Sequence, residues 1–158
     1  MLIVADSSAL VALATCDALA ILAALYDNVK VPQAVLDEVT ISGKPQARIL
    51  TEFLTERVVP VDTTQFVFMA GGLGKGEIEA MLLYKVMGAD FLLIDDRRAR
   101  TVAESNEIRC IGALGILLMA KHHNLIGQVT PFVEILRNSP IHYSTVLLEK
   151  TLQLAGEL

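Results

Sequence analysis

Five acidic residues stand at expected boundaries of helices and strands, where their side chains could meet in one cleft: Asp6, Glu38, Glu77, Asp95 and Asp96. Carboxylate oxygens are the ligands that hard divalent cations prefer. A cation held in this way can polarise a phosphate ester and activate a water molecule. We therefore expect the five carboxylates to converge around a divalent metal ion and to take part in catalysis.

The aspartates follow two apolar segments that are typical of buried parallel strands. Asp6 comes directly after residues 2–5, and Asp95 and Asp96 come directly after residues 91–94. In open α/β sheets, ligands bind beyond the carboxyl ends of the strands. The two apolar segments therefore predict a shared site for these three side chains.

The two glutamates are expected in helices. Glu77 opens a segment with helical periodicity, directly after the glycine-rich residues 71–76, and Glu38 lies in a helix that begins near residue 32. The glycine-rich segment is no P-loop, because that motif needs Gly where Met69 stands and Ser or Thr where Gly76 stands. We expect the glycines to turn the chain and bring Glu77 towards the metal.

Each carboxylate taken alone has a purely structural explanation. Asp6 could cap the following helix, Glu77 could favour a helix dipole, and Glu38 could belong to a solvated helix face. Asp95 and Asp96 are harder to explain in this way, because adjacent carboxylates repel each other unless a cation or an arginine balances them. The functional interpretation therefore depends on several positions together.

Alternation of strands and helices predicts an α/β fold with three layers, α/β/α, around a central, mostly parallel sheet. We expect one domain over residues 1–158. The strands are predicted over residues 2–5, 29–31, 58–61, 91–94 and 109–111. The helices are predicted over residues 10–14, 17–25, 32–39, 47–56, 63–70, 77–87, 97–106, 113–123, 131–136 and 143–154.

Composition bears on partners and location. With 53% hydrophobic residues and a mean hydropathy of +0.52, the chain is more apolar than a typical soluble domain. A homodimer or a protein partner is therefore expected. The longest apolar stretch, residues 9–26, is interrupted by Asp17, so no membrane span is predicted. The start of the chain lacks a signal-peptide pattern, and we expect a cytoplasmic protein.

The net charge of −5 argues against a surface that binds polyanions in general. Acidic residues in a metal site nevertheless count against that total while supporting phosphate chemistry. Arg97, Arg98 and Arg100 follow directly after the aspartate pair and are candidates for phosphate contact.

Four segments, in this order, resemble motifs of the PIN domain, and specifically the compact prokaryotic PIN-like proteins related to VapC ribonuclease toxins. They are residues 3–10 (IVADSSAL), 31–39 (VPQAVLDEV), 76–80 (GEIEA) and 89–97 (ADFLLIDDR). They span the first two thirds of the chain. The resemblance implies the PIN-like α/β/α fold, and an endoribonuclease that depends on Mg²⁺ or Mn²⁺.

Residue by residue, the resemblance assigns four acidic positions. Asp6 falls on the first, Glu38 on the second, Glu77 on the third, and Asp95 or Asp96 on the fourth. The third position is Glu where many members have Asp, and the fourth motif lacks the Thr that often precedes its Asp. We expect Asp6, Glu77, Asp95 and Asp96 to bind the metal. We expect these four and Glu38 to take part in catalysis, as metal ligands, as groups that hydrogen-bond to metal-bound waters, or by orienting the attacking water.

The implied substrate is RNA, and the implied partner is an antitoxin protein if the chain is the toxin of a VapBC-type pair. Two alternatives stay open. A receiver-like or phosphatase-like domain would bind Mg²⁺ and transfer a phosphoryl group to an aspartate. A catalytically silent PIN-like module would instead use its apolar surface for assembly.

Overall fold

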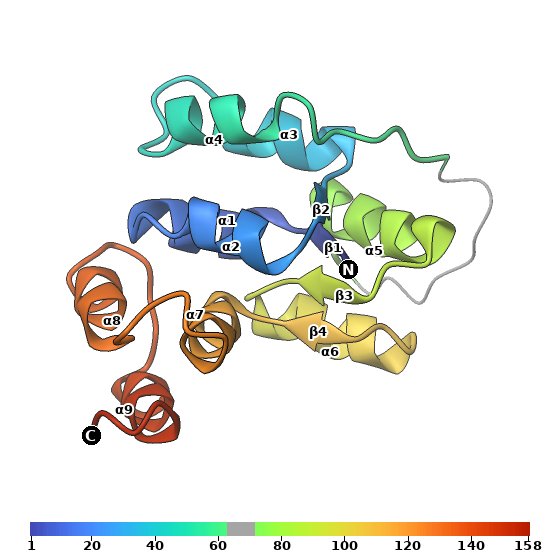
Figure 1. Ribbon diagram of the computed structural model, residues 1–158. Coiled ribbons are helices and arrows are strands. Elements are labelled where there is room, and N and C mark those ends of the chain that lie inside the picture. The colour runs from blue at the N-terminus through green and yellow to red at the C-terminus, as the bar shows by residue number, and fades with distance from the viewer. Residues whose placement is uncertain (63–71) are drawn as a thin grey trace.

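The computed structural model describes residues 1–62 and 72–158, and within these ranges the chain forms a parallel sheet of four strands flanked by nine helices (Figure 1). The strand order is β2-β1-β3-β4. The strands are β1 (Leu2–Ala5), β2 (Asn28–Lys30), β3 (Phe91–Leu93) and β4 (Cys110–Ile111). The predicted α/β/α fold with a mostly parallel sheet is confirmed.

The centre of the sheet is fully buried, which explains the continuous apolar segments in the sequence. Ile3 of β1 pairs with Val29 of β2 on one side and with Phe91 of β3 on the other. Ile3 and its neighbour Val4 are 0% exposed. Helices cover both faces of a parallel sheet, so side chains on either face of such a strand must be apolar.

Helices cover both faces of the sheet. Figure 1 shows α1, α2 and α7 on one side of the sheet and α5 and α6 on the other, and α5 packs directly on β1 and β3. The helices are α1 (Ser7–Thr15), α2 (Leu19–Leu25), α3 (Gln33–Val39), α4 (Ala47–Leu54), α5 (Lys75–Met87), α6 (Arg97–Ser105), α7 (Ala113–His122), α8 (Thr130–Arg137) and α9 (Thr145–Leu154).

The direction of the chain across the sheet reverses between β1 and β3. After β1 the chain passes through α1 and α2 to β2, and it later returns to the other side of β1 through α5 and β3. Ala5 pairs with Leu93, and the N–H of Asp6 donates a hydrogen bond of 2.8 Å to the carbonyl of Leu93. The carboxyl ends of β1 and β3 therefore lie side by side, where α/β sheets form their binding crevices.

Two predicted elements need comment. The strand expected over residues 58–61 is reduced to a single parallel bridge between Val31 and Val58. Pro60 lacks the N–H group with which a longer strand would continue the ladder. The helix expected over residues 63–70 lies outside the described residues.

Within the described ranges, no single helix has both the length and the apolar composition needed to cross a membrane. Helices α1 and α2 are long and apolar enough only when taken together, and they are bent by 116° relative to each other. Their apolar side chains, such as Leu10, Leu13 and Leu22, are instead buried in the core.

Candidate functional site

A hollow of about 250 Å³ lies at the carboxyl ends of β1 and β3. Its lining joins side chains from the end of β1 and from the ends of α1, α3, α5 and α6. The lining residues are Asp6, Ser7, Ser8, Glu38, Glu77 and Asp96. The structure thus brings together four of the five carboxylates that we expected to share a site.

Asp6 is the most constrained carboxylate of the hollow. It is only 2% exposed, and its Oδ1 atom is buried without a hydrogen-bond partner among the described residues. Burial raises its pKa from 3.8 to about 7. A hydrogen bond from the backbone N–H of Ser7 opposes this rise, whereas the charges of the other three carboxylates add to it. A buried acceptor that the protein leaves unsatisfied calls for an explanation, and a bound cation is one.

Glu38 is held by a residue that the sequence analysis did not assign to the site. The hydroxyl of Ser7, in the first turn of α1, donates a hydrogen bond to Oε2 of Glu38 in α3. Gly76 lies beside this pair, and a Cβ atom there would stand 3.1 Å from the same Oε2 atom. Gly76 therefore lets the start of α5 approach Glu38 closely.

Glu77 and Glu79 have separate tasks, as their angular separation on a helix predicts. The N–H of Gly74 donates a 3.0 Å hydrogen bond to Oε1 of Glu77, which fixes this side chain at the start of α5. Glu79 is buried outside the hollow and accepts a 3.3 Å hydrogen bond from the N–H of Ala34. Glu79 thus ties α5 to the first turn of α3, the helix that carries Glu38.

Asp95 and Asp96 face different surroundings. Asp96 lines the hollow, and its Oδ2 atom accepts a 3.0 Å hydrogen bond from the N–H of Ala99 at the start of α6. Both oxygens of Asp95 are bound elsewhere: Oδ1 accepts from the N–H of Ala113 at 2.9 Å, and Oδ2 accepts from the hydroxyl of Tyr143 at 2.5 Å. The structure therefore places Asp95 outside the hollow that we expected it to share.

The donor set of the hollow suits a hydrated hard cation. In the part of the chain that the structure describes, no three Asp, Glu, His or Cys side chains lie close enough together to bind one ion directly. Mg²⁺ keeps several of its waters and needs only one or two protein carboxylates. The unpartnered Oδ1 of Asp6, with further carboxylate oxygens around it, meets that requirement.

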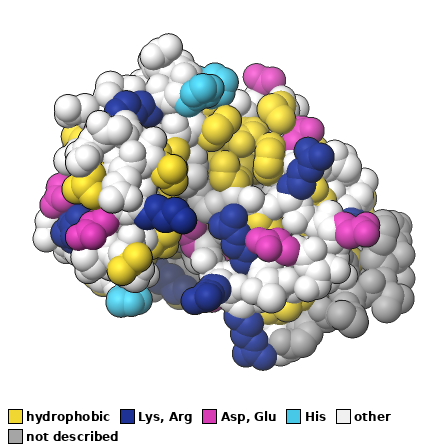
Figure 2. Space-filling view, turned by 90° about the horizontal axis from the view of Figure 1, so that it is seen from below, with side chains coloured by type: hydrophobic (Ala, Val, Ile, Leu, Met, Phe, Trp, Pro, Cys, Tyr) yellow, Lys and Arg dark blue, Asp and Glu magenta, His cyan; other side chains and the backbone are white. Residues whose placement is uncertain are grey.

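The three arginines after Asp96 are not equivalent. Arg100 pairs with Glu104 at 3.1 Å and also donates to the carbonyl of Cys110 at 3.4 Å, so it ties α6 to β4. Arg97 and Arg98 are exposed, and their contact with phosphate stays a prediction. The face seen in Figure 2 carries Lys and Arg side chains, several of them in its lower centre, with Asp and Glu side chains beside and above them.

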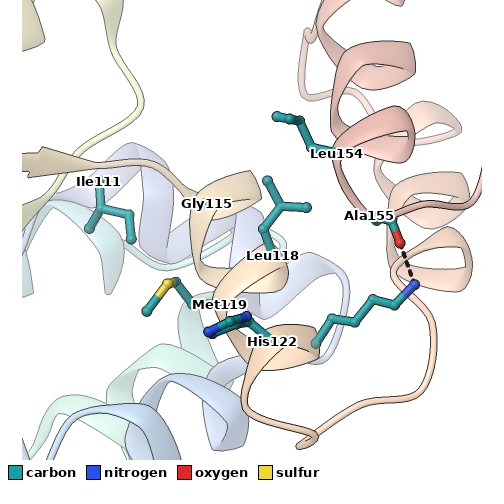
Figure 3. Close-up of a pocket in the computed structure, with 8 residues that line it drawn as sticks. Ile111, Gly115, Leu118, Met119, His122, Leu154 and Ala155 are labelled. Carbon is teal, nitrogen blue, oxygen red and sulfur yellow. Dashed lines mark hydrogen bonds between the residues drawn. The ribbon is translucent and has the colours of Figure 1, made fainter.

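A second hollow of about 630 Å³ is an apolar groove between α7 and α9 (Figure 3). Leu118 and Leu154 approach it from the two helices. Lys121, which also lines the groove, donates a hydrogen bond of 2.5 Å to the carbonyl of Ala155. Its lining is Ile111, Gly115, Leu118, Met119, Lys121, His122, Leu154 and Ala155. The described lining of this groove includes no carboxylate side chain, so the groove does not share the chemistry of the first hollow.

Comparison with known families identifies one relationship, which covers almost the entire chain. A family model described as a PIN domain matches residues 2–157. The chain has no match among the curated proteins or the solved structures that were compared with it. The PIN domain is a nuclease-type fold, so the family and the position of the acidic hollow agree.

Proposed function

The chain belongs to the PIN domain family, and from this premise we propose that it is a metal-dependent endoribonuclease that hydrolyses RNA phosphodiester bonds. PIN domains are generally nucleases and typically use divalent metals. The observation that carries the proposal is Oδ1 of Asp6, a buried and unpartnered carboxylate oxygen inside a hollow lined by three more carboxylates.

Asp6 and Asp96 would hold the cation most directly, because they follow adjacent strands and line the same hollow. Glu77 would complete the set from the start of α5 through a water bound to the cation. When bound, Mg²⁺ or Mn²⁺ would lower the pKa of a water molecule and neutralise the charge that develops on the phosphate.

Glu38 is suited to orient the attacking water. Ser7 fixes Oε2 of Glu38, which leaves Oε1 of the same carboxylate as the acceptor for a hydrogen bond from water. An exposed carboxylate at this position can also take up the proton that the water releases. The hydroxyl of Ser7 thus acts on the reaction through the direction in which Glu38 points.

The charge of the hollow sets a requirement on the substrate. Four carboxylates repel a phosphodiester, and the lining includes no Lys or Arg among the described residues. Substrate binding therefore depends on a cation that offsets this charge. A toxin role, an antitoxin partner, a homodimer and a cytoplasmic location stay predictions.

The test is cleavage of a panel of structured RNAs with Mn²⁺, with Mg²⁺ and with EDTA. We expect cleavage by the wild type with either metal, none with EDTA and a loss of about 100-fold or more in Asp6→Asn. The matched control is Asp90→Asn, because Asp90 lies at the opposite end of the sheet, where it accepts a 2.8 Å hydrogen bond from the N–H of Leu2.

Full cleavage by Asp6→Asn, or cleavage that EDTA does not affect, would contradict the proposal. A wild-type protein that binds neither Mn²⁺ nor Mg²⁺ and cleaves no RNA would instead support the catalytically silent alternative. Asp90→Asn should cleave at the wild-type rate, because its amide oxygen still accepts from Leu2.

A further inference from the structure

Two consecutive carboxylates leave the end of β3 in different directions. Asp96 turns into the acidic hollow, whereas Asp95 turns towards the start of α7 and the segment before α9. Only one peptide group separates the two Cα atoms, so the orientation of one side chain constrains the backbone of the other. The contacts that hold the side chain of Asp95 therefore also influence the direction of the Asp96 side chain.

Three contacts fix Asp95. Its Oδ1 accepts from the N–H of Ala113 at 2.9 Å, its Oδ2 accepts from the hydroxyl of Tyr143 at 2.5 Å, and its own N–H donates to Oγ of Ser8 at 3.4 Å. Gly112 makes room for this arrangement, because a Cβ atom there would stand 2.6 Å from Oδ1 of Asp95. The contact with Ser8 connects Asp95 to the hollow, because Ser8 is one of the residues that line it.

Tyr143 is the most distant of these partners in sequence, 48 positions from Asp95. It is half-buried and packs against the hydrophobic core, just before Ser144 caps α9. Burial raises the pKa of its hydroxyl far above the ordinary value, and the charge of Asp95 raises it further. The hydroxyl therefore stays protonated and acts as the donor in this contact.

We propose that Tyr143 is a positioning residue for the metal site: it holds Asp95 against the start of α7 and so keeps Asp96, and not Asp95, directed at Asp6. The inference rests on the proposed metal-dependent function. It also gives the segment that precedes the last helix, far from most of the hollow's residues along the chain, a role in the geometry of the metal site. Loss of the hydroxyl leaves Oδ2 of Asp95 without its partner in a half-buried position, and the turn through Asp96 loosens.

The test compares Tyr143→Phe with Tyr84→Phe. Each substitution removes one buried or half-buried hydroxyl that contacts the protein, because the hydroxyl of Tyr84 accepts a 3.3 Å hydrogen bond from the N–H of Arg109. Mn²⁺ affinity is measured by calorimetry without RNA, and cleavage is measured over a range of Mn²⁺ concentrations. Thermal unfolding verifies that each variant is folded.

We expect Tyr143→Phe to weaken Mn²⁺ binding about tenfold, the lower end of the effect of outer partners at metal sites. Cleavage by this variant should need more Mn²⁺ but approach the wild-type rate at saturation. Tyr84→Phe should bind Mn²⁺ as the wild type does, whatever its loss of stability. Wild-type Mn²⁺ affinity in Tyr143→Phe, or an equal loss of affinity in both variants, would overturn the inference.

Asp95→Asn and Asp96→Asn separate positioning from direct ligation. Asparagine at position 95 can still accept from Ala113, so its loss of Mn²⁺ affinity should be much smaller than the loss in Asp96→Asn. Equal losses would make Asp95 a direct ligand and overturn the inference, while leaving the metal-dependent function intact. A wild type that binds no Mn²⁺ would overturn both.

Discussion

Two carboxylates with little side-chain exposure, Asp6 at the end of β1 and Glu157 near the end of the chain, show opposite ways of accommodating a negative charge. Asp6 is 2% exposed, and its Oδ1 has no partner among the described residues. The side chain of Glu157 is 8% exposed, and both of its oxygens accept several hydrogen bonds. Both side chains are thus largely screened from solvent, but only Glu157 has hydrogen-bond donors for both of its oxygens.

Glu157 links the end of α7 to the start of α8. Its carboxylate accepts from Nζ of Lys121 at 2.8 Å, from the N–H of Val129 at 2.8 Å, and from the N–H and hydroxyl of Thr130 at 2.9 Å and 2.6 Å. Burial raises the pKa of Glu157, but these hydrogen bonds outweigh it and hold the pKa at about 2. The carboxylate also satisfies backbone groups at the start of α8, where a negative charge is favourable.

This difference in hydrogen bonding distinguishes a structural carboxylate from a functional one. Glu157 is supplied with donors by its own chain, so its charge stabilises the fold. Asp6 is buried and has three carboxylates around it, so its charge costs stability until a cation binds beside it. A buried carboxylate with a raised pKa, placed at the reversal point of an α/β sheet, is therefore a better sign of a ligand site than acidity alone.

The largest expected effect is on catalysis. Asp6→Asn should lower RNA cleavage in the presence of Mn²⁺ by about 100-fold or more, because even outer partners at metal sites contribute up to that factor. The rate is measured with labelled RNA at saturating Mn²⁺. Glu157→Gln is the matched control, since it alters a hydrogen-bonded carboxylate outside the hollow, and this variant should cleave RNA at the wild-type rate below its melting temperature.

The next effect is on stability without metal. The pKa of Asp6 is raised to about 7, so the stability that the protonated form provides is present below pH 4 and is lost as the pH rises through 7. Asp6→Asn should therefore raise the free energy of unfolding by a few kcal/mol at pH 8 and by much less at pH 5. Urea unfolding in EDTA at the two pH values measures this difference. A destabilised Asp6→Asn protein at pH 8 would contradict the account of Asp6.

Glu157 should behave in the opposite way. Its pKa is lowered, so its stabilising effect is present above pH 4.5 and disappears as the pH falls towards 2. Glu157→Gln should lower the free energy of unfolding by about 1–3 kcal/mol at pH 7, because charge-assisted hydrogen bonds are lost. The exposed Glu149 provides the control substitution Glu149→Gln. A deficit that stays constant down to pH 2 would argue against this origin of the low pKa.

The smallest expected effect concerns the orientation of Glu38. Ser7→Ala removes the hydroxyl that donates to Glu38, and cleavage should fall only several-fold, as expected for one hydrogen bond of about 1 kcal/mol. Ser105→Ala is the control, because Ser105 donates to a carbonyl of its own helix α6. A loss as large as that of Asp6→Asn would mean that Ser7 does more than orient Glu38.

Much of the sheet and part of the site could be predicted from the sequence. The apolar segments before Asp6 and Asp96 indicated two buried parallel strands, and adjacent parallel strands bring residues beyond their carboxyl ends together. Gly76 and the first helical turn placed Glu77 near the same edge. These inferences depend on local pattern and on general sheet geometry, which a single sequence carries.

The choice between Asp95 and Asp96 could not be made in that way. It depends on donors that lie 18 and 48 positions away from Asp95, on Ala113 and Tyr143. The roles of Ser7 and of Glu79 likewise depend on the packing of α1 and α5 against α3. Contacts of this kind follow from tertiary packing, and no periodicity in the sequence predicts them.

The most direct test of the central claim is the anomalous difference density of a crystal of the wild-type protein soaked with Mn²⁺. Our account predicts one or two peaks in the hollow, with the strongest beside Oδ1 of Asp6 and within reach of Asp96. Density only at other surface carboxylates, or an empty hollow at Mn²⁺ concentrations that support cleavage, would contradict it.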